Sequence, residues 1–350
     1  MKRLLVSLVG GLYAFLAGWS VTSAAEVPDA SASSAPALAA YGDRLVVTWA
    51  GEEGTGAHHV WYSLFNGSVF TPQADIPGAL TTTAPAVAAV GKALYVAIAP
   101  PDTGDKIYLY ASTGAGFGAG TPLCDAETCA RTRAAPALVS DGGTLFAAWT
   151  ALDGAIMTAS RSSGGWVIDS TPIPNAATNP TTGPTLTLFE HRLRLAWVKA
   201  SASGEAVAVS TGTIVPSASA LSQPSIAWSA PIEIAAAQTK VAPSLGVFTV
   251  GDSTPGAASE LVESLFLAWT NADSTVEFAR FNPLTGTWAP SASPSPLPVG
   301  TFTVQAPALA SFTYQTPNQE CLRSNVVGVT GKKPSHPVDV AAKPIGTVCP

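Results

Sequence analysis

The sequence has little charge of either sign. Charged residues make up 11% of the 350 positions, and 17 Lys and Arg stand against 23 Asp and Glu, which gives a net charge of −6 at pH 7. Disordered chains and coiled coils need more charge than this, and a nucleic-acid-binding surface needs an excess of basic residues. The composition therefore excludes these three classes, and we expect no nucleic acid among the partners.

Long hydrophobic runs are also missing beyond the first 25 residues. Residues 1–25 contain a basic start at Lys2 and Arg3, an apolar stretch over 4–18 and small residues over 21–25. This pattern is typical of a cleavable signal peptide, with cleavage after Ala24 or Ala25. The alternative is an uncleaved membrane anchor, for which the apolar stretch is short. We expect a mature chain without a transmembrane span, either secreted or held in the periplasm or at the cell surface.

Cysteine is scarce, with four residues at Cys124, Cys129, Cys321 and Cys349. An even number in an exported chain favours two disulfides, and three pairings are possible. A bond between Cys124 and Cys129 would close a small loop, and one between Cys321 and Cys349 would hold the C-terminus. No Cys-x-x-Cys pair is present and the histidines are not spaced like zinc ligands, so we expect no metal site and no cofactor.

The sequence is rich in turn residues, and it contains a repeat. Gly and Pro number 31 and 29. A proline followed by a small residue and an aliphatic residue recurs at intervals of 49, 51, 48, 59 and 64, at Pro36, Pro85, Pro136, Pro184, Pro243 and Pro307. Internal similarity at a period near 50 residues indicates a repeat architecture such as a propeller.

Each repeat contains four short segments with the composition of β-strands. In the first five repeats the second segment ends at a common position, which is occupied by Trp49, Ile98, Trp149, Trp197 and Trp269. The connections between the segments are rich in Gly, Asp and Asn, as in hairpin turns. Asn66 and Gly67 form one such connection, although they also begin a glycosylation sequon. Four strands per repeat predict an all-β fold, a β-propeller built of four-stranded antiparallel blades.

The second segment of each repeat has no charged face, as expected for a strand packed between two neighbouring blades. Arg192 and Arg194 are the exception, because they share one face of the second segment of the fourth repeat. This indicates either an open face at that point or partners for the two guanidinium groups that the sequence does not identify.

The repeats predict a single propeller domain over residues 36–350, preceded by a flexible lead-in over 26–35. The last repeat lacks the Trp position, so we expect six blades with a degenerate sixth blade, in which a Cys321–Cys349 bond replaces part of the packing. The alternative is five blades followed by a disulfide-stapled tail. The lead-in is short for a segment that closes the ring.

The repeats resemble those of secreted β-propeller lectins and sialidase-like propellers, over residues 36–312. The resemblance rests on the Leu-x-x-Ala-Trp run and on the turn between the third and fourth segments, where sialidase-like proteins carry an Asp-box. The corresponding turns end at Phe70, Trp166 and Trp288, and the Asp is absent from all three. The resemblance implies that a ligand binds on the face formed by the loops between second and third strands and between blades.

Acidic residues follow the Trp position in these loops. Carboxylates accept hydrogen bonds from sugar hydroxyls, and indole rings stack on the apolar faces of sugars. The candidate ligand-binding residues are therefore Glu53, Asp105, Asp153, Glu205 and Asp273 together with Trp49, Trp149, Trp197 and Trp269. The simpler interpretation is that the acids form turns and that the Trp side chains pack between blades.

Catalysis finds less support in the sequence. Sialidase-like hydrolysis needs an arginine cluster, and only Arg131 and Arg133 are placed like the family's first arginine, without its Arg-Ile-Pro form. A glycosidase needs two carboxylates about 5–10 Å apart, which spacing along the chain does not reveal. No nucleophile elbow, phosphate loop or dinucleotide fingerprint is present, so we name no catalytic residue.

The sequence thus predicts a secreted, non-catalytic binding module with a glycan as its favoured ligand. The first alternative is a sialidase-like glycoside hydrolase. The second is a structural or protein-interaction propeller with a partner at the cell surface.

Overall fold

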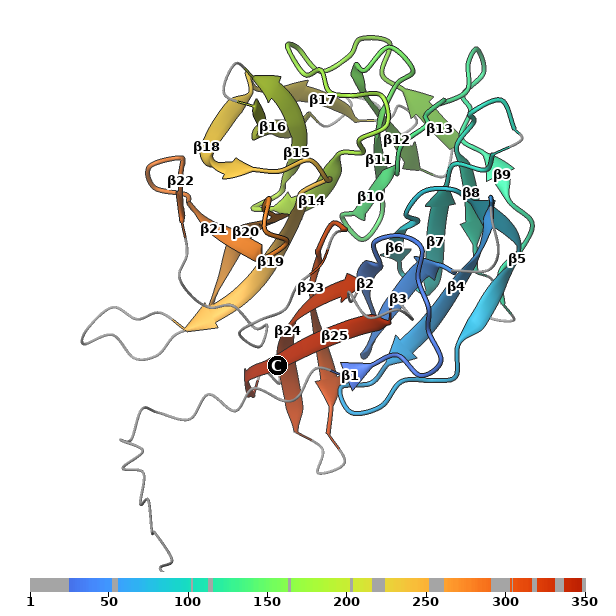
Figure 1. Cartoon of the computed structure of the whole chain (residues 1–350), viewed down its shortest axis with the longest axis vertical. Helices are drawn as coiled ribbons and strands as arrows, with labels where there is room; N and C mark the ends of the chain where they lie inside the picture. Colours follow the sequence, from blue (N-terminus) through green and yellow to red (C-terminus); the bar gives the residue numbers. More distant parts are fainter. Residues whose placement is uncertain are drawn as a thin grey trace, which may run out of the picture.

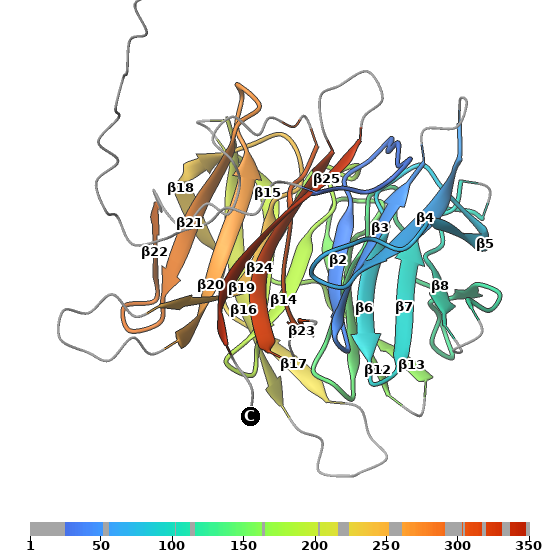
Figure 2. The same cartoon turned by 90° about the horizontal axis from the view of Figure 1, so that it is seen from below.

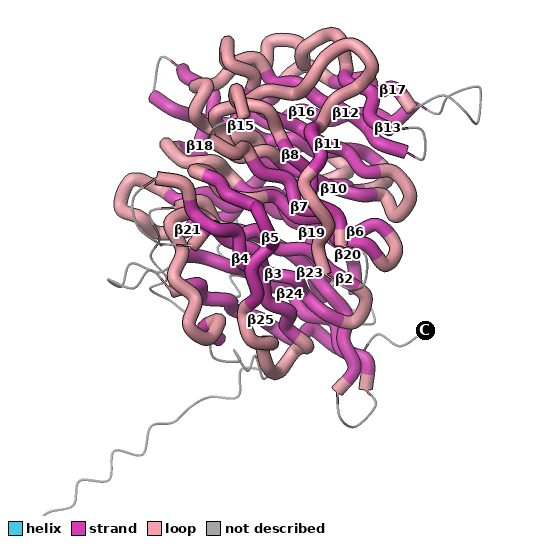
Figure 3. Tube along the Cα trace, turned by 90° about the vertical axis from the view of Figure 1, so that its right-hand side faces the viewer, coloured by secondary structure: helices cyan, strands magenta, loops and turns pink. Residues whose placement is uncertain are grey.

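The computed structural model describes residues 25–51, 56–101, 103–112, 116–162, 165–201, 204–215, 224–251, 261–290, 303, 305–316, 320–330 and 337–347. These residues form six antiparallel sheets arranged as blades around a ring, so the predicted six-bladed β-propeller is confirmed (Figure 1). The described residues contain strands and loops but no helix (Figure 3). In this part of the chain there is accordingly no helix that could cross a membrane.

The first three blades follow the first three sequence repeats. Blade 1 contains β2 (Ala37–Tyr41), β3 (Arg44–Ala50), β4 (His58–Phe65) and β5 (Ala74–Thr81). Blade 2 contains β6 (Ala86–Val90), β7 (Ala93–Ile98), β8 (Tyr108–Ala111) and β9 (Thr121–Pro122). Blade 3 contains β10 (Ala137–Ser140), β11 (Leu145–Thr150), β12 (Ile156–Ser162) and β13 (Gly165–Ile168).

The last three blades are more elaborate. Blade 4 has five strands, which are β14 (Thr185–Phe189), β15 (Arg192–Ser201), β16 (Gly204–Val215), β17 (Ser225–Trp228) and β18 (Ile232–Gln238). Blade 5 contains β19 (Ser244–Gly251), β20 (Leu261–Thr270), β21 (Val276–Asn282) and β22 (Thr287–Pro290). Blade 6 contains β23 (Ala308–Gln315), β24 (Cys321–Thr330), β25 (Val338–Thr347) and β1 (Ala25–Glu26).

The strands run between the two faces of the ring (Figure 2). We call the loop face the one formed by the connections between second and third strands and between blades, such as residues 99–107 and 123–136. We call the hairpin face the one formed by the connections between first and second strands and between third and fourth strands, such as residues 41–44 and 65–70. The two faces carry different side chains and are described separately below.

The hydrophobic core is divided into six layers between adjacent blades, because most buried side chains of the second strands are apolar on both faces; Arg194 of β15 and Asn325 of β24 are exceptions. On β3, Leu45, Val47 and Trp49 pack against blade 6, whereas Val46 packs against Val96 of blade 2. This alternation follows from the two-residue period of a strand. The predicted burial of second strands on both faces is therefore confirmed.

The connections between blades carry a second repeat, which lies four residues before the repeated proline. Buried threonines occupy this position in four blades, and these are Thr81, Thr132, Thr239 and Thr303. Their side chains form local turns: the Thr132 hydroxyl accepts a hydrogen bond from the Ala134 N–H at 3.0 Å, and the Thr303 hydroxyl accepts one from the Gln305 N–H at 3.0 Å. A Thr-x-x-Ala-Pro pattern thus sets how the chain enters each of these blades.

The N-terminal segment closes the ring. β1 pairs antiparallel with β25, with Ala25 opposite Val340 and Glu26 opposite Asp339, and the Val27 N–H donates to the Val338 carbonyl at 3.0 Å. Val27 is 0% exposed. The Thr330 hydroxyl donates to the Ser34 carbonyl at 2.8 Å. Residues 26–35 therefore pack into blade 6 and its junction with blade 1, and the expectation of a merely flexible lead-in is corrected.

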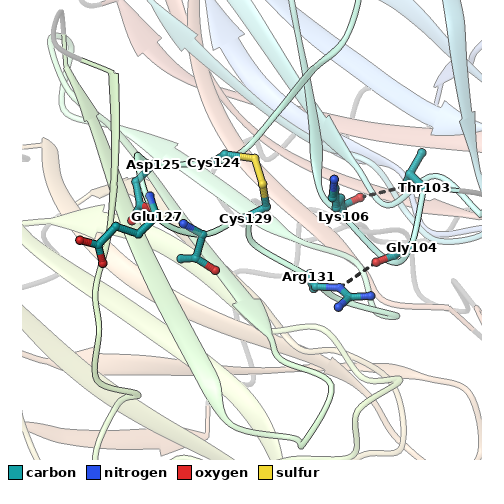
Figure 4. Close-up of a disulfide and its surroundings, with 9 residues drawn as sticks. Thr103, Gly104, Lys106, Cys124, Asp125, Glu127, Cys129 and Arg131 are labelled. Carbon is teal, nitrogen blue, oxygen red and sulfur yellow. Dashed lines mark hydrogen bonds between the residues drawn. A yellow bond between two sulfur atoms is a disulfide. The ribbon is translucent and has the colours of Figure 1, made fainter.

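Blade 6 keeps a full set of strands although its sequence repeat is the weakest. The register of β24 against β23 places Val329 at the position that Trp occupies in four of the other blades, and Val329 is buried. Cys321 at the start of β24 is disulfide-bonded, while its expected partner Cys349 lies outside the described residues. The predicted Cys124–Cys129 disulfide is confirmed (Figure 4).

The hairpin at Asn66 and Gly67 shows why the turn residues are needed. The Asn66 side-chain oxygen accepts hydrogen bonds from the Ser68 and Val69 N–H groups at 3.0 and 2.8 Å. Gly67 has a φ of +93°, and a Cβ at this position would lie 2.2 Å from the ring of Tyr314 in blade 6. The turn interpretation of this sequence is therefore the one that the structure uses.

Two aspartates should affect stability with opposite signs. Burial raises the pKa of Asp169 above its ordinary value of 3.8, although the Thr158 hydroxyl donates a hydrogen bond to its carboxylate. Backbone N–H groups of Thr128 and Glu127 lower the pKa of Asp125 below the same value. A raised pKa in the folded state costs stability at neutral pH, and a lowered one adds stability there.

Asp169→Asn should therefore raise the midpoint of thermal unfolding at pH 7. Its advantage should shrink as the pH falls through the raised pKa, because the folded wild type then takes up the proton. Asp125→Asn should lower the midpoint at pH 7, and this effect should decrease as the pH falls below 3.8 through the lowered pKa of the folded wild type. Thermal unfolding of the three proteins between pH 3 and 8 checks both signs, and two variants with parallel pH profiles would refute them.

Candidate functional site

The four tryptophans of the repeat lie in the core and not at a surface. Trp49, Trp149, Trp197 and Trp269 are at most 2% exposed. Each belongs to a different layer between two blades. A sugar cannot stack on an indole that protein atoms cover on both sides, so the expectation that these residues bind ligand is corrected in favour of core packing.

Two of the acidic candidates are turn formers on the loop face. The Asp153 carboxylate accepts a hydrogen bond from the Ala155 N–H at 3.0 Å. The Asp273 carboxylate accepts bonds from the N–H and the hydroxyl of Thr275 at 3.0 and 2.7 Å. These are the local bonds of Asx turns, and they account for an acid at each position without a ligand.

The other two acidic candidates that the structure describes lie in different blades. Asp105, in the loop between β7 and β8 of blade 2, pairs at 3.5 Å with Arg133 of the connection between blades 2 and 3. Glu205 lies at the start of the third strand of blade 4, where its side chain is half-buried and its carbonyl accepts a bond from the Thr239 N–H at 3.0 Å. Glu53 lies outside the described residues. The ring of carboxylates beside indoles that the sequence suggested is therefore not what the described loops form.

The buried arginine that broke the apolar pattern of blade 4 has partners in its own blade and in blade 5. Arg194 is 6% exposed, its guanidinium lies 4.6 Å from the centre of the Phe281 ring, and it donates to the Thr211 hydroxyl at 2.8 Å. Burial lowers its pKa, while the Glu190 carboxylate 3.9 Å away opposes this effect. Arg194 is thus enclosed between blades 4 and 5, and Arg192 is exposed.

A channel of about 480 Å³ runs along the axis of the ring. The repeated Pro-small-aliphatic segments of all six blades line it with alanine, proline and aliphatic side chains. Its charged lining residues are Glu263 and Arg323, which form an ion pair at 2.7 Å. Because these two charges already satisfy each other, the channel offers few free polar groups to hold a ligand.

A partly exposed group of two aromatic residues and an arginine lies where blades 2 and 3 meet. The Arg161 guanidinium lies 5.4 Å from the centre of the Tyr95 ring, and its Nη1 donates to the Tyr95 hydroxyl at 3.4 Å. Trp166 is directly opposite Arg161 in the pairing of β12 with β13, so their side chains lie on the same face of the sheet. We call Tyr95, Arg161 and Trp166 the Arg161 cluster.

The local sequence explains why this cluster sits at a rim. Met157, Ala159 and Arg161 alternate along one face of β12, and the first two contact the hydrophobic layer between blades 2 and 3. Arg161 comes next along this face, beside the turn to β13, and Tyr95 and Trp166 pack against the same layer while staying partly exposed. The three side chains are therefore fixed by packing on one side and open to solvent on the other.

The cluster combines the two properties that sugar recognition uses. A guanidinium supplies up to five fixed hydrogen-bond donors, and the indole and phenol rings supply flat apolar faces next to it. Among the described residues Arg161 forms no ion pair. Apart from the N–H group that binds the Tyr95 hydroxyl, its donors are suited to an uncharged or acidic hydroxyl-rich molecule.

Comparison of whole structures relates the chain to solved propellers. The SapL1 lectin in complex with α-methyl fucoside matches with a TM-score of 0.55 and 13% identity, over 91% of this chain and 98% of that one. The fold is that of the lectin propellers. The fungal lectin from Aleuria aurantia, described as a six-bladed β-propeller that recognises fucose, matches with a TM-score of 0.50 and 13% identity over 90% and 96% of the two chains.

A sialidase shares the same arrangement of strands. The Trypanosoma rangeli sialidase matches with a TM-score of 0.53 and 9% identity, over 90% of this chain and 55% of the sialidase chain. The resemblance to lectin and sialidase propellers drawn from the repeats is therefore confirmed at the level of the fold. No protein-family profile and no characterised protein matches this chain by sequence.

The turn that contains Arg161 could be recognised in the sequence, but the ligand site was predicted on the other face of the ring. Arg161 stands in the run from Ser160 to Trp166, which occupies the position of an Asp-box and lies on the hairpin face, whereas the predicted site lay on the loop face. Along β12, Arg161 interrupts the alternation of apolar side chains five residues before Trp166. This pattern indicates the edge of the hydrophobic layer between the blades. Its proximity to Tyr95 of another blade depends on how blades 2 and 3 pack.

Proposed function

We propose that this protein is a secreted, non-catalytic carbohydrate-binding propeller and that the Arg161 cluster is its sugar site. The single observation that carries the proposal is the Arg161 guanidinium placed over the Tyr95 ring and opposite Trp166, in a partly exposed position. The apolar face of a sugar would stack on an aromatic ring while its hydroxyls accept hydrogen bonds from Arg161.

The structural neighbours support the choice of ligand class. The two lectin propellers bind fucose or a fucoside, so fucosylated glycans are the first ligands to test with this chain. The sialidase neighbour makes glycoside hydrolysis the competing proposal. We favour binding without turnover, because hydrolysis needs a pair of carboxylates at the sugar and the Arg161 cluster contains none.

The proposal is tested by a glycan array with the mature chain, with turnover of fluorogenic glycosides measured on the same preparation. Saturable binding that weakens about tenfold or more in both Arg161→Gln and Trp166→Leu is expected, because a charge-assisted bond or a stacking contact is worth about 1.5–3 kcal/mol. Retention of the wild-type unfolding temperature shows that the variants are folded.

Arg280→Gln is the matched control. Arg280 lies on the third strand of blade 5 one position earlier in the repeat, so its side chain is on the opposite face of its sheet. The Arg280→Gln substitution removes the same charge as Arg161→Gln and should leave glycan binding unchanged. Absence of binding to every glycan, or an equal loss in all three variants, would contradict the proposal, and turnover would favour the hydrolase instead.

A further inference from the structure

Two cations lie side by side on the loop face, between blades 2 and 3. Lys106 and Arg131 are partners in an antiparallel bridge. The Ile107 N–H donates to the Ala130 carbonyl at 3.0 Å, and the Thr132 N–H donates to the Asp105 carbonyl at 2.7 Å. These bonds make Lys106 and Arg131 a non-hydrogen-bonded pair, the type in which opposite side chains are closest, with Cα atoms about 4.5 Å apart.

Neither cation forms an ion pair with an acid in the part of the chain that the structure describes. Within the described residues, the Lys106 ammonium and the terminal nitrogens of Arg131 have no carboxylate partner. The acid beside them, Asp105, pairs with the exposed Arg133 at 3.5 Å. Like charges directly opposite each other in a sheet destabilise it, so the pair costs stability in the free protein. An anion placed between the two groups would remove this repulsion.

The position of Arg131 is fixed before any ligand arrives. Its Nε donates to the Gly104 carbonyl at 2.8 Å, which leaves the two terminal nitrogens directed away from this bond (Figure 4). The segment that carries Arg131 follows the hairpin closed by the Cys124–Cys129 disulfide, and the Ala130 N–H donates to the Leu123 carbonyl at 2.9 Å at its base. A guanidinium held in this way loses little conformational entropy when it binds.

The geometry points to a second binding site here, for the anionic group of an acidic glycan, with Lys106 and Arg131 holding a sulfate or carboxylate between them. An anion with several oxygens suits this pair, because the guanidinium can donate two parallel bonds and the ammonium can donate a third. Arg133 lies two residues along the same extended segment as Arg131, on the same exposed side, and contributes a weaker, already paired charge.

The second site is separate from the Arg161 cluster. Tyr95 of that cluster pairs with Ala111, five residues beyond Lys106 along the same part of the chain. Five extended residues span about 16 Å, and the two groups face opposite ends of the ring. The two sites can therefore be tested independently, and the failure of one does not imply the failure of the other.

Isothermal titration of the mature protein with a sulfated hexasaccharide, with its desulfated counterpart and with sodium sulfate tests the site. We expect saturable binding of the sulfated sugar, about tenfold weaker in Lys106→Gln and in Arg131→Gln. Binding should weaken as NaCl is raised. Saturable binding of sodium sulfate that is lost in Arg131→Gln supports the same site with the free ion as ligand.

Lys240→Gln is the control for unspecific attraction of anions. Lys240 follows Thr239 as Arg133 follows Thr132, so it is an exposed cation at the equivalent place of another blade. Its replacement should change the affinity less than twofold. An equal loss in all three variants, equal affinity for the desulfated sugar, or no binding of any of the three probes would overturn the proposal.

Discussion

A chain that begins at Pro28 should unfold roughly 6–10 °C below one that begins at Ala25. The shorter chain lacks β1, the Val27 N–H bond to Val338 and a side chain that is 0% exposed. Burial of a valine contributes about 1.5–3 kcal/mol and each lost hydrogen bond about 1 kcal/mol, so the loss is about 3–5 kcal/mol. Thermal unfolding of the two purified chains measures it.

The reason for so large an effect is that a propeller is stable only as a closed ring. Blade 6 receives β1 from the N-terminus and β23, β24 and β25 from the C-terminus, so this blade joins the two ends of the chain (Figure 1). Glu26→Gln, which changes an exposed side chain on the same strand and keeps the pairing, should shift the midpoint by less than about 2 °C. Equal midpoints for the chains starting at Ala25 and Pro28 would show that β1 does not hold the ring.

Asn325→Leu should destabilise the protein by about 2–5 kcal/mol, the second large effect that we expect. Asn325 is 4% exposed, and its side chain bonds both backbone groups of Thr249 in blade 5, donating to the carbonyl at 2.8 Å and accepting from the N–H at 3.0 Å. Leucine has a similar volume but cannot form either bond, so two buried backbone groups lose their partner. Denaturant unfolding monitored by tryptophan fluorescence gives the change in free energy.

Asn282→Leu is the matched control for this substitution. Asn282 is exposed, and its side chain accepts local bonds from the N–H groups of Leu284 and Thr285 at 2.9 and 3.4 Å. Its replacement should cost less than about 1 kcal/mol, because water can take the place of the lost bond. If the two leucine variants were equally stable, the bonds between Asn325 and Thr249 would not lock blade 5 to blade 6.

The fold could be predicted from the sequence because the evidence for it is local and repeated. Strands come from short apolar runs bounded by turn residues, and the six prolines mark six such sets. The sixth blade was expected to be degenerate because Val329 replaces Trp there, yet a buried valine still fills the same layer. The contribution of Ala25 and Glu26 to that blade could not be predicted, because a two-residue strand has no periodicity to detect.

The candidate site was predicted less well, for a physical reason. Packing in the core was the simpler interpretation of Trp49 and its counterparts, but a sugar site stayed open because an indole serves both and only the covering blade distinguishes them. The turn that ends at Trp166 was compared with an Asp-box, but Arg161 within it was not predicted to bind a ligand. Its partner Tyr95 is 66 positions away, and no local pattern relates the two.

Periodicity along the chain was enough to establish the all-β class, the blade repeat and the turns, since each depends on neighbouring residues and on the alternation of a strand. The closure of the ring, the burial of the Trp positions and the joining of Tyr95 to Arg161 and of Lys106 to Arg131 arose only in the tertiary structure. Each of these requires residues far apart in sequence to meet, and which residues meet depends on how the strands pair and how neighbouring blades pack against each other.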